Sequence, residues 1–133
     1  MIAYLDASAL VKRYLVEPRS QETIALTAES EMVATSIVSR AEVSAALAKA
    51  VRLGLVTEDV ARKAQRSFDG DWDDLLRVPV PEALVARAGT LAWDHALRGY
   101  DAVQLASALT WQESVATEIV LATFDQQLWE AAP

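Results

Sequence analysis

The chain has 133 residues, 53% of them hydrophobic, with only 4 Gly and 4 Pro, so it is long enough for one domain with a real core and is not disordered or fibrous. It has no cysteine and a single histidine, His95, which excludes a disulfide framework, a thiolate zinc site, a cysteine nucleophile and any site that needs two imidazoles. The formal net charge of −7 argues, taken alone, against a nucleic-acid partner, because phosphate binding usually depends on surplus Lys and Arg.

Short apolar runs alternate along the chain with longer stretches of helical periodicity. In chain order they predict a strand over residues 2–5, a helix over 7–16, a helix opening near Pro18, a strand over 32–35, helices over 36–53 and 57–68, a strand over 76–80, helices over 82–97 and 101–111, a strand over 119–122 and a short helix over 126–130. Pro79 indicates that the third strand lies at an edge of the sheet. This alternation predicts one α/β domain over residues 1–133, with a parallel sheet between two layers of helices.

The chain begins without the basic and apolar segments of a signal peptide, and charges interrupt each apolar stretch well short of a bilayer's thickness. We therefore expect a cytoplasmic protein with no membrane partner.

Three aspartates stand at or near the start of predicted helices, and two of them follow strands, where the active site of a parallel sheet is expected. Ligands of such sheets bind at the carboxyl ends of the strands. Asp6 follows the first strand directly, Asp125 follows the fourth, and Asp101 comes behind a glycine turn formed by Gly99 and Tyr100.

Each of these aspartates also has a purely structural interpretation, in which it caps a helix. Asp6 can accept a backbone N–H of the helix that begins at Ala7. The pairs Asp101–Gln104 and Thr123–Gln126 both have the spacing of a capping box, which would leave Asp125 in a first helical turn. Taken singly, capping is the favoured interpretation of every one of them.

Glu42 lies inside the long, alanine-rich helix, and its neighbours one turn away are Val38, Ala45 and Ala46. A carboxylate among such small, apolar side chains must be protonated, paired or bound to a cation. A salt bridge to Lys49, or a place at the edge of the helix face, is the alternative and weighs about equally.

If Asp6, Glu42, Asp101 and Asp125 converge, their charges repel one another in a partly desolvated cleft, and a divalent cation would remove that repulsion. All available ligands are oxygens, which favours Mg²⁺ or Mn²⁺ over zinc. Such a centre suits metal-assisted hydrolysis of a phosphodiester, and the ion adds local positive charge that the net charge omits. Whether the four side chains meet does not follow from the residues alone.

Three stretches resemble the PIN-domain family, and specifically its VapC-type toxins. They are residues 2–10, residues 39–47, and residues 97–109 followed by 121–125. Each is modest alone, but their order and spacing match the family over nearly the whole chain.

The resemblance implies a three-layer α/β/α sandwich around a parallel sheet of four or five strands. It implies a Mg²⁺- or Mn²⁺-dependent endoribonuclease, the toxin of a VapBC toxin–antitoxin pair, with Asp6, Asp101 and Asp125 as the main metal ligands and Glu42 in direct contact with the metal or one step removed. Ser8 and Thr123 would support ligands or water through their hydroxyl groups. The implied partners are RNA, a VapB-type antitoxin and a second copy of the chain in a homodimer.

One residue departs from the pattern, because VapC-like chains often carry His where this chain has Gln104. No essential role in metal binding can be argued for Gln104 from the sequence. The four tryptophans (Trp72, Trp93, Trp111 and Trp129) are interpreted as core or dimer-interface residues, and His95 as a helix-surface residue.

Two other classes of enzyme also gather acids at strand ends. A haloacid-dehalogenase-type phosphatase needs a second Asp two residues after the first, where this chain has Ser8, and a receiver domain needs a Lys after a late strand, which is missing. The stronger alternative is a catalytically silent PIN-like module that acts by binding a partner or RNA.

Overall fold

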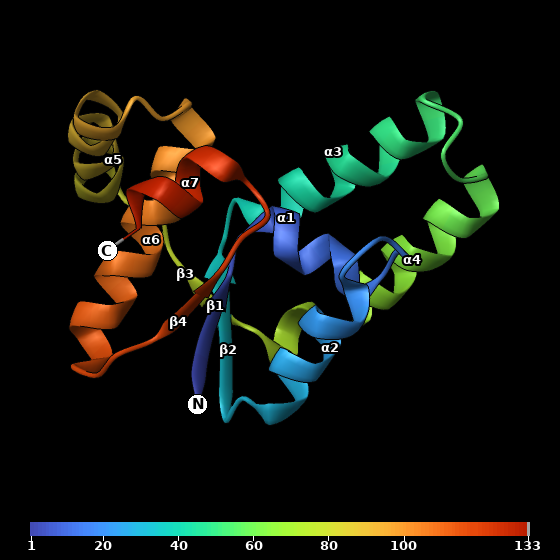
Figure 1. Ribbon diagram of the computed structural model, residues 1–133, viewed down its shortest axis with the longest axis horizontal. Coiled ribbons are helices and arrows are strands. Elements are labelled where there is room, and N and C mark those ends of the chain that lie inside the picture. Colours follow the sequence, from blue (N-terminus) through green and yellow to red (C-terminus); the bar gives the residue numbers. More distant parts are fainter. Residues whose placement is uncertain (133) are drawn as a thin grey trace.

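The computed structural model describes residues 1–132 as four strands and the helices that connect them (Figure 1). The strands are β1 (Ile2–Leu5), β2 (Met32–Ser36), β3 (Leu76–Val78) and β4 (Val120–Ala122). The α-helices are α1 (Ala7–Leu10), α2 (Ser20–Glu29), α3 (Ser39–Arg52), α4 (Glu58–Asp71), α5 (Glu82–His95), α6 (Gly99–Val115) and α7 (Gln126–Ala131). Two short 3-10 helices, η1 (Val11–Arg13) and η2 (Trp72–Asp74), extend α1 and α4.

All described strand pairs are parallel, and the order across the sheet is β3-β2-β1-β4. The predicted parallel sheet is therefore confirmed. β3 lies at an edge, as Pro79 indicated, with the proline just beyond the strand's last residue. Because the strands are parallel, the carboxyl ends of β1 and β4 lie at the same end of the sheet, and the segments that follow the two strands meet there.

Helices cover both faces of the sheet, which makes the predicted three-layer α/β/α arrangement (Figure 1). Successive residues of β1 point to opposite faces, as a strand requires. Ala3 and Leu5 pack into the core beneath α1, α3 and α4, whereas Tyr4 packs into the core beneath α5 and α6. The central strand is buried from both sides, with Ala3, Tyr4 and Leu5 fully inaccessible.

Several predicted helix boundaries are wrong. The predicted helix over 7–16 becomes α1 followed by the tighter η1, and the helix predicted from residue 36 begins three residues later because Ser36 still belongs to β2. The break predicted at Gly99 and Tyr100 lies earlier: Ala96 ends α5 in a left-handed conformation with φ of 53°, and α6 already begins at Gly99.

The longest described helix, α6, has 17 residues, and within residues 1–132 no helix combines the length and hydropathy needed to cross a bilayer. His95 is exposed at the end of α5, as predicted. Trp72 and Trp111 lie in the core, but Trp93 is 91% exposed and Trp129 is 64% exposed. Trp93 and Trp129 therefore do not belong to the core, and the other part of their interpretation, a place in a dimer interface, stays a prediction.

Candidate active site

Asp6 is the buried centre of the site. The residue follows β1, is 3% exposed, and is the N-cap of α1. Its Oδ1 accepts hydrogen bonds from the Ala9 backbone N–H at 2.9 Å and from the Ser8 hydroxyl at 2.7 Å. The capping interpretation of Asp6 is therefore correct, but it accounts for one oxygen only.

The second oxygen of Asp6 connects β1 to the segment after β4. The Thr123 hydroxyl donates to Asp6 Oδ2 at 2.6 Å, and Thr123 Oγ1 in turn accepts the backbone N–H of Asp125 at 3.0 Å. Ser8 adds a second link, because its Oγ accepts the Phe124 backbone N–H at 2.8 Å. The two hydroxyl residues thus fix the loop that carries Asp125 against the loop that carries Asp6.

Asp125 is itself the N-cap of α7, where its Oδ1 accepts the Leu128 backbone N–H at 2.9 Å. The capping-box interpretation of Thr123 and Gln126 is wrong, because the Thr123 hydroxyl is directed at Asp6 and not at the helix. Asp125 therefore lies just before α7, not in its first turn.

Asp101 and Asp125 share one cation, the guanidinium of Arg98. Arg98 Nε contacts Asp101 Oδ2 at 2.8 Å, and a second nitrogen of Arg98 contacts Asp125 Oδ2. The Asp101 and Asp125 side chains are 15% and 18% exposed, whereas that of Arg98 is 71% exposed. Because α6 begins at Gly99, Asp101 lies in its first turn and the capping-box interpretation of Asp101 and Gln104 is wrong.

Glu42 extends from α3 toward α6 and accepts a hydrogen bond from Gln104 Nε2 at 2.7 Å. The predicted alternative, a salt bridge to Lys49, does not form in the described part of the chain. Gln104 is 1% exposed, and its second amide hydrogen is donated to Ser39 Oγ at 2.9 Å. Its carbonyl oxygen accepts the Tyr4 hydroxyl at 2.5 Å.

Every polar atom of the Gln104 side chain therefore has a partner, and these partners fix the orientation of the amide. The sequence offers no argument for an essential role of Gln104 in metal binding, whereas in the structure its amide orients the Glu42 carboxylate. No signal in the sequence links positions 42 and 104, which lie on different helices.

The electrostatics of the site reflect carboxylates that share a partly dry space. Burial raises the pKa of Asp6, the hydrogen bonds from Thr123 and Ser8 oppose this rise, and the nearby charge of Asp101 adds to it. Burial also raises the pKa of Glu42, against the hydrogen bond from Gln104 and together with the charges of Asp6 and Asp101. Burial is thus the main reason that the ionised forms of Asp6 and Glu42 are disfavoured, and the neighbouring carboxylates add to it.

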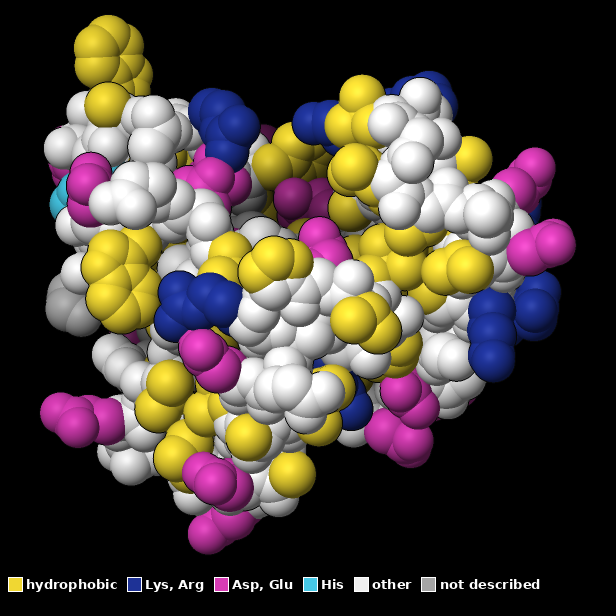
Figure 2. All heavy atoms as spheres, turned by 45° about the vertical axis from the view of Figure 1, so that its right-hand side comes forward, with side chains coloured by type: hydrophobic (Ala, Val, Ile, Leu, Met, Phe, Trp, Pro, Cys, Tyr) yellow, Lys and Arg dark blue, Asp and Glu magenta, His cyan; other side chains and the backbone are white. Residues whose placement is uncertain are grey.

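The four predicted acids thus lie near one another at the carboxyl end of the sheet. Acidic side chains lie recessed in the hollow between the helices, with basic side chains at its rim (Figure 2). Their oxygens, with those of Ser8 and Thr123, form a donor set suited to a hard divalent cation. In the described conformation, no three acids or histidines within residues 1–132 are close enough to bind one ion. Arg98 forms ion pairs with two of the four carboxylates, those of Asp101 and Asp125.

The contacts of Gln104 lead to a prediction about stability. Replacing Gln104 by Leu would leave the Tyr4 hydroxyl and the Glu42 carboxylate without their partner, and a buried polar group left unpaired costs about 1–3 kcal/mol. We expect a loss of about 2 kcal/mol, or roughly 6–10 °C in melting temperature. Thermal unfolding followed by circular dichroism measures this.

The matched control is Gln127→Leu on the exposed surface of α7, which should change stability by less than about 0.5 kcal/mol. Equal melting temperatures for the two variants would show that the amide network around Gln104 contributes nothing.

Comparisons with known proteins agree with this fold. The family model described as the PIN domain matches residues 3–132, and the chain belongs to this family. Ribonuclease VapC45 and Ribonuclease VapC49, both from Mycobacterium tuberculosis, are each 37% identical to it over 131 residues, which is 98% of this chain and 89% of each relative.

Two solved structures are similar in fold at low sequence identity. A toxin–antitoxin complex from Klebsiella pneumoniae has a chain with a TM-score of 0.71 and 18% identity, over 98% of this chain and 92% of that one. VapBC2 from Rickettsia felis, bound to a DNA fragment from their promoter, has a chain with a TM-score of 0.60 and 14% identity, over 94% of this chain and 100% of that one.

Proposed function

We propose that the protein is a metal-dependent endoribonuclease and the toxin component of a VapBC toxin–antitoxin module. The observation that carries this proposal is the junction of Asp6, Thr123 and Asp125, which draws carboxylates from the two ends of the chain into one cleft with Asp101 and Glu42. Membership of the PIN-domain family and the two ribonuclease relatives support it.

In this proposal, Asp6, Asp101 and Asp125 hold Mg²⁺ or Mn²⁺, with Glu42 in direct contact or one step removed. The ion supplies Lewis-acid activation of the scissile phosphate and of the attacking water, and it offsets negative charge in the transition state. The chain's own residues set the geometry: Ser8 and Thr123 orient Asp6, Thr123 also fixes the backbone before Asp125, and Gln104 orients Glu42.

Arg98 has a part in this proposal that could not be predicted from the sequence. Its guanidinium places one positive charge between Asp101 and Asp125, where a bound divalent cation would place two. We propose that Arg98 turns outward when a metal binds. Its 71% exposure makes this movement inexpensive, because an exposed ion pair contributes only about 0.2–1 kcal/mol.

A VapB-type antitoxin is the proposed partner, supported by the similarity to a toxin–antitoxin complex and to VapBC2. The predicted homodimer and the predicted cytoplasmic location remain predictions, as does the treatment of residues 1–133 as one PIN-like domain.

The experiment that tests the proposal is cleavage of single-stranded RNA by the purified protein with Mg²⁺ or Mn²⁺. We expect cleavage that EDTA abolishes and added metal restores, with products that carry no 2′,3′-cyclic phosphate, because a water and not the 2′-hydroxyl of the RNA attacks the phosphate. Cleavage that persists in EDTA, or products ending in a 2′,3′-cyclic phosphate, would contradict it. RNA that stays intact with saturating metal would favour the alternative, a catalytically silent PIN-like module.

A further inference from the structure

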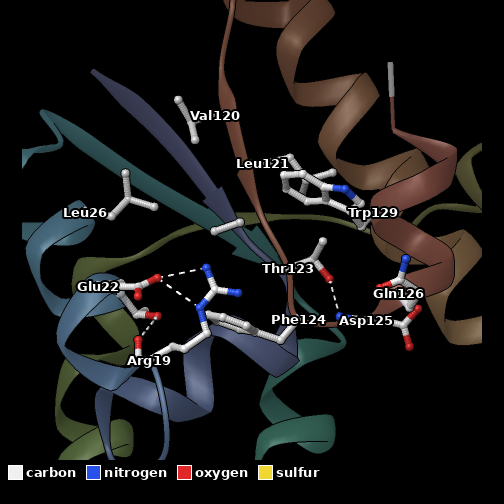
Figure 3. A pocket seen from close by; sticks show the side chains of 12 residues that line it. Arg19, Glu22, Leu26, Val120, Leu121, Thr123, Phe124, Asp125, Gln126 and Trp129 are labelled. Atoms are coloured by element: carbon white, nitrogen blue, oxygen red, sulfur yellow. Dashed lines mark hydrogen bonds and ion pairs between the residues drawn. The ribbon is translucent and has the colours of Figure 1, made fainter.

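A hollow of about 450 Å³ lies next to the acidic cluster, over β4 and between α2 and α7 (Figure 3). Its size is within the range of small-molecule sites. Thr123 and Asp125 belong both to its lining and to the cluster. Whatever occupies the hollow therefore lies beside the carboxylates.

Two cationic side chains pack on the ring of Phe124, and of the three residues Phe124 and Arg19 line the hollow. The Arg19 guanidinium lies 5.2 Å from the ring centroid, and Lys12 Nζ lies 4.6 Å from it. Phe124 follows Thr123 directly, so this positive charge is positioned by the same segment that carries Asp125. In a chain with a net charge of −7, paired cations beside an acidic site are the feature that can attract a phosphate.

Arg19 is held in an unfavourable backbone conformation. Its φ of 71° is in the left-handed region, which residues with a side chain rarely adopt, and a glycine would be the less strained choice at this N-cap of α2. Its ion pair with Glu22, at 2.9 Å, joins two side chains that are each 63% exposed. Such a pair is weak in water and can be exchanged for contact with a phosphate.

The opposite wall carries an exposed indole. Trp129 extends from α7 into the lining and is 64% exposed (Figure 3). The backbone N–H of Trp129 bonds to the Asp125 carbonyl at 3.0 Å, so the start of α7 positions both residues. An aromatic face and an arginine that line the same hollow are the combination that binds a base and its phosphate in single-stranded nucleic acids.

We propose that this hollow binds one nucleotide of the RNA substrate adjacent to the scissile phosphate, with Trp129 stacking on the base and Arg19, assisted by Lys12, contacting the phosphate. The proposal rests on the proposed ribonuclease function and adds a substrate subsite to it. It also accounts for the exposure of Trp129, which the core does not explain.

The test measures RNA binding apart from cleavage. Fluorescence anisotropy of a short labelled single-stranded RNA of mixed sequence, titrated with the full chain in EDTA over a series of salt concentrations, gives the affinity and its salt dependence. Trp129→Ala should weaken binding at least about fivefold. Arg19→Gly, which suits the backbone conformation, should weaken it at least about fivefold and reduce the slope of log affinity against log salt by about 0.7.

The chain offers matched controls for both changes. Arg62→Ala removes an arginine of similar exposure that pairs with Glu58 on α4, and Trp93→Ala removes an exposed tryptophan from α5. Both should bind RNA as the wild type does. If Arg19→Gly and Trp129→Ala also bind like the wild type while the wild type cleaves RNA with metal, the subsite is wrong and the ribonuclease stands. If the wild type neither binds nor cleaves RNA, both proposals are wrong.

Discussion

Asp101→Asn and Asp6→Asn should each abolish RNA cleavage while leaving the fold intact. Each substitution removes one negative charge from the proposed metal site, and a bound cation contributes several kcal/mol of transition-state stabilisation. Since each 1.4 kcal/mol changes the rate tenfold, we expect the rate constant to fall at least about 100-fold. Single-turnover cleavage of a labelled RNA with Mg²⁺ measures this.

Asparagine preserves the local hydrogen bonds at position 6. Its Oδ1 can still accept from Ser8 and Ala9, and its amide can donate to Thr123 Oγ1 once that hydroxyl rotates. The control is Asp94→Asn on the exposed surface of α5, which should cleave RNA at the wild-type rate. If Asp101→Asn or Asp6→Asn cleaved RNA at the wild-type rate, the carboxylate that it lacks would have no part in the mechanism.

The raised pKa of Asp6 determines how its ionisation changes the stability of the folded protein with pH. The folded protein binds a proton at this carboxyl more tightly than the unfolded chain, so protonation stabilises the fold at acid pH, and this contribution is lost as the pH rises through the folded-state pKa. At mildly alkaline pH without metal, Asp6→Asn should therefore melt at the wild-type temperature or above it. A large drop in melting temperature would show that lost activity reflects unfolding.

Divalent metal should raise the melting temperature of the wild type by roughly 10 °C. A ligand that binds only the native state at 100 times its dissociation constant stabilises that state by about 2.7 kcal/mol, and a domain of this size gains about 3–5 °C per kcal/mol. Thermal unfolding in EDTA and in increasing Mn²⁺ measures the effect. Asp101→Asn should lose most of the increase.

Arg98→Ala tests whether Arg98 competes with the metal for the carboxylates of Asp101 and Asp125. Without metal this variant should melt slightly below the wild type, because Asp101 and Asp125 lose their shared cation. With metal it should bind Mn²⁺ about fivefold more tightly, since two exposed ion pairs, worth about 1 kcal/mol together, no longer have to break. Weaker metal binding by Arg98→Ala would show that the arginine assists the metal.

The sequence predicts the fold well because the signals are local and repetitive. Short apolar runs between helical patterns imply a parallel sheet, and Pro79 identifies β3 as one of its two edge strands. Boundaries are less predictable, as the helix beginning at Gly99 shows: glycine suggests a turn, but the chain turns at Ala96, whose left-handed conformation no propensity indicates.

Some residues of the candidate site could be predicted from the sequence and others could not. Asp6 and Asp125 could be singled out because they follow strands, and parallel pairing brings such positions together. Arg98 and Gln104 could not, because their importance comes from contacts with residues 27 and 62 positions away, which depend on how the helices pack. Capping and the acidic cluster are also compatible: Asp6 caps α1 with one oxygen while the other joins Thr123.

The most direct test of the central claim is calorimetric titration of Mn²⁺ into the metal-free wild type and into Asp6→Asn, with Asp94→Asn alongside. Carboxylates that share one cleft predict saturable binding by the wild type and by Asp94→Asn, and affinity at least about tenfold lower for Asp6→Asn. Equal affinity in all three proteins, or no saturable binding by the wild type, would mean that these side chains do not form a metal centre.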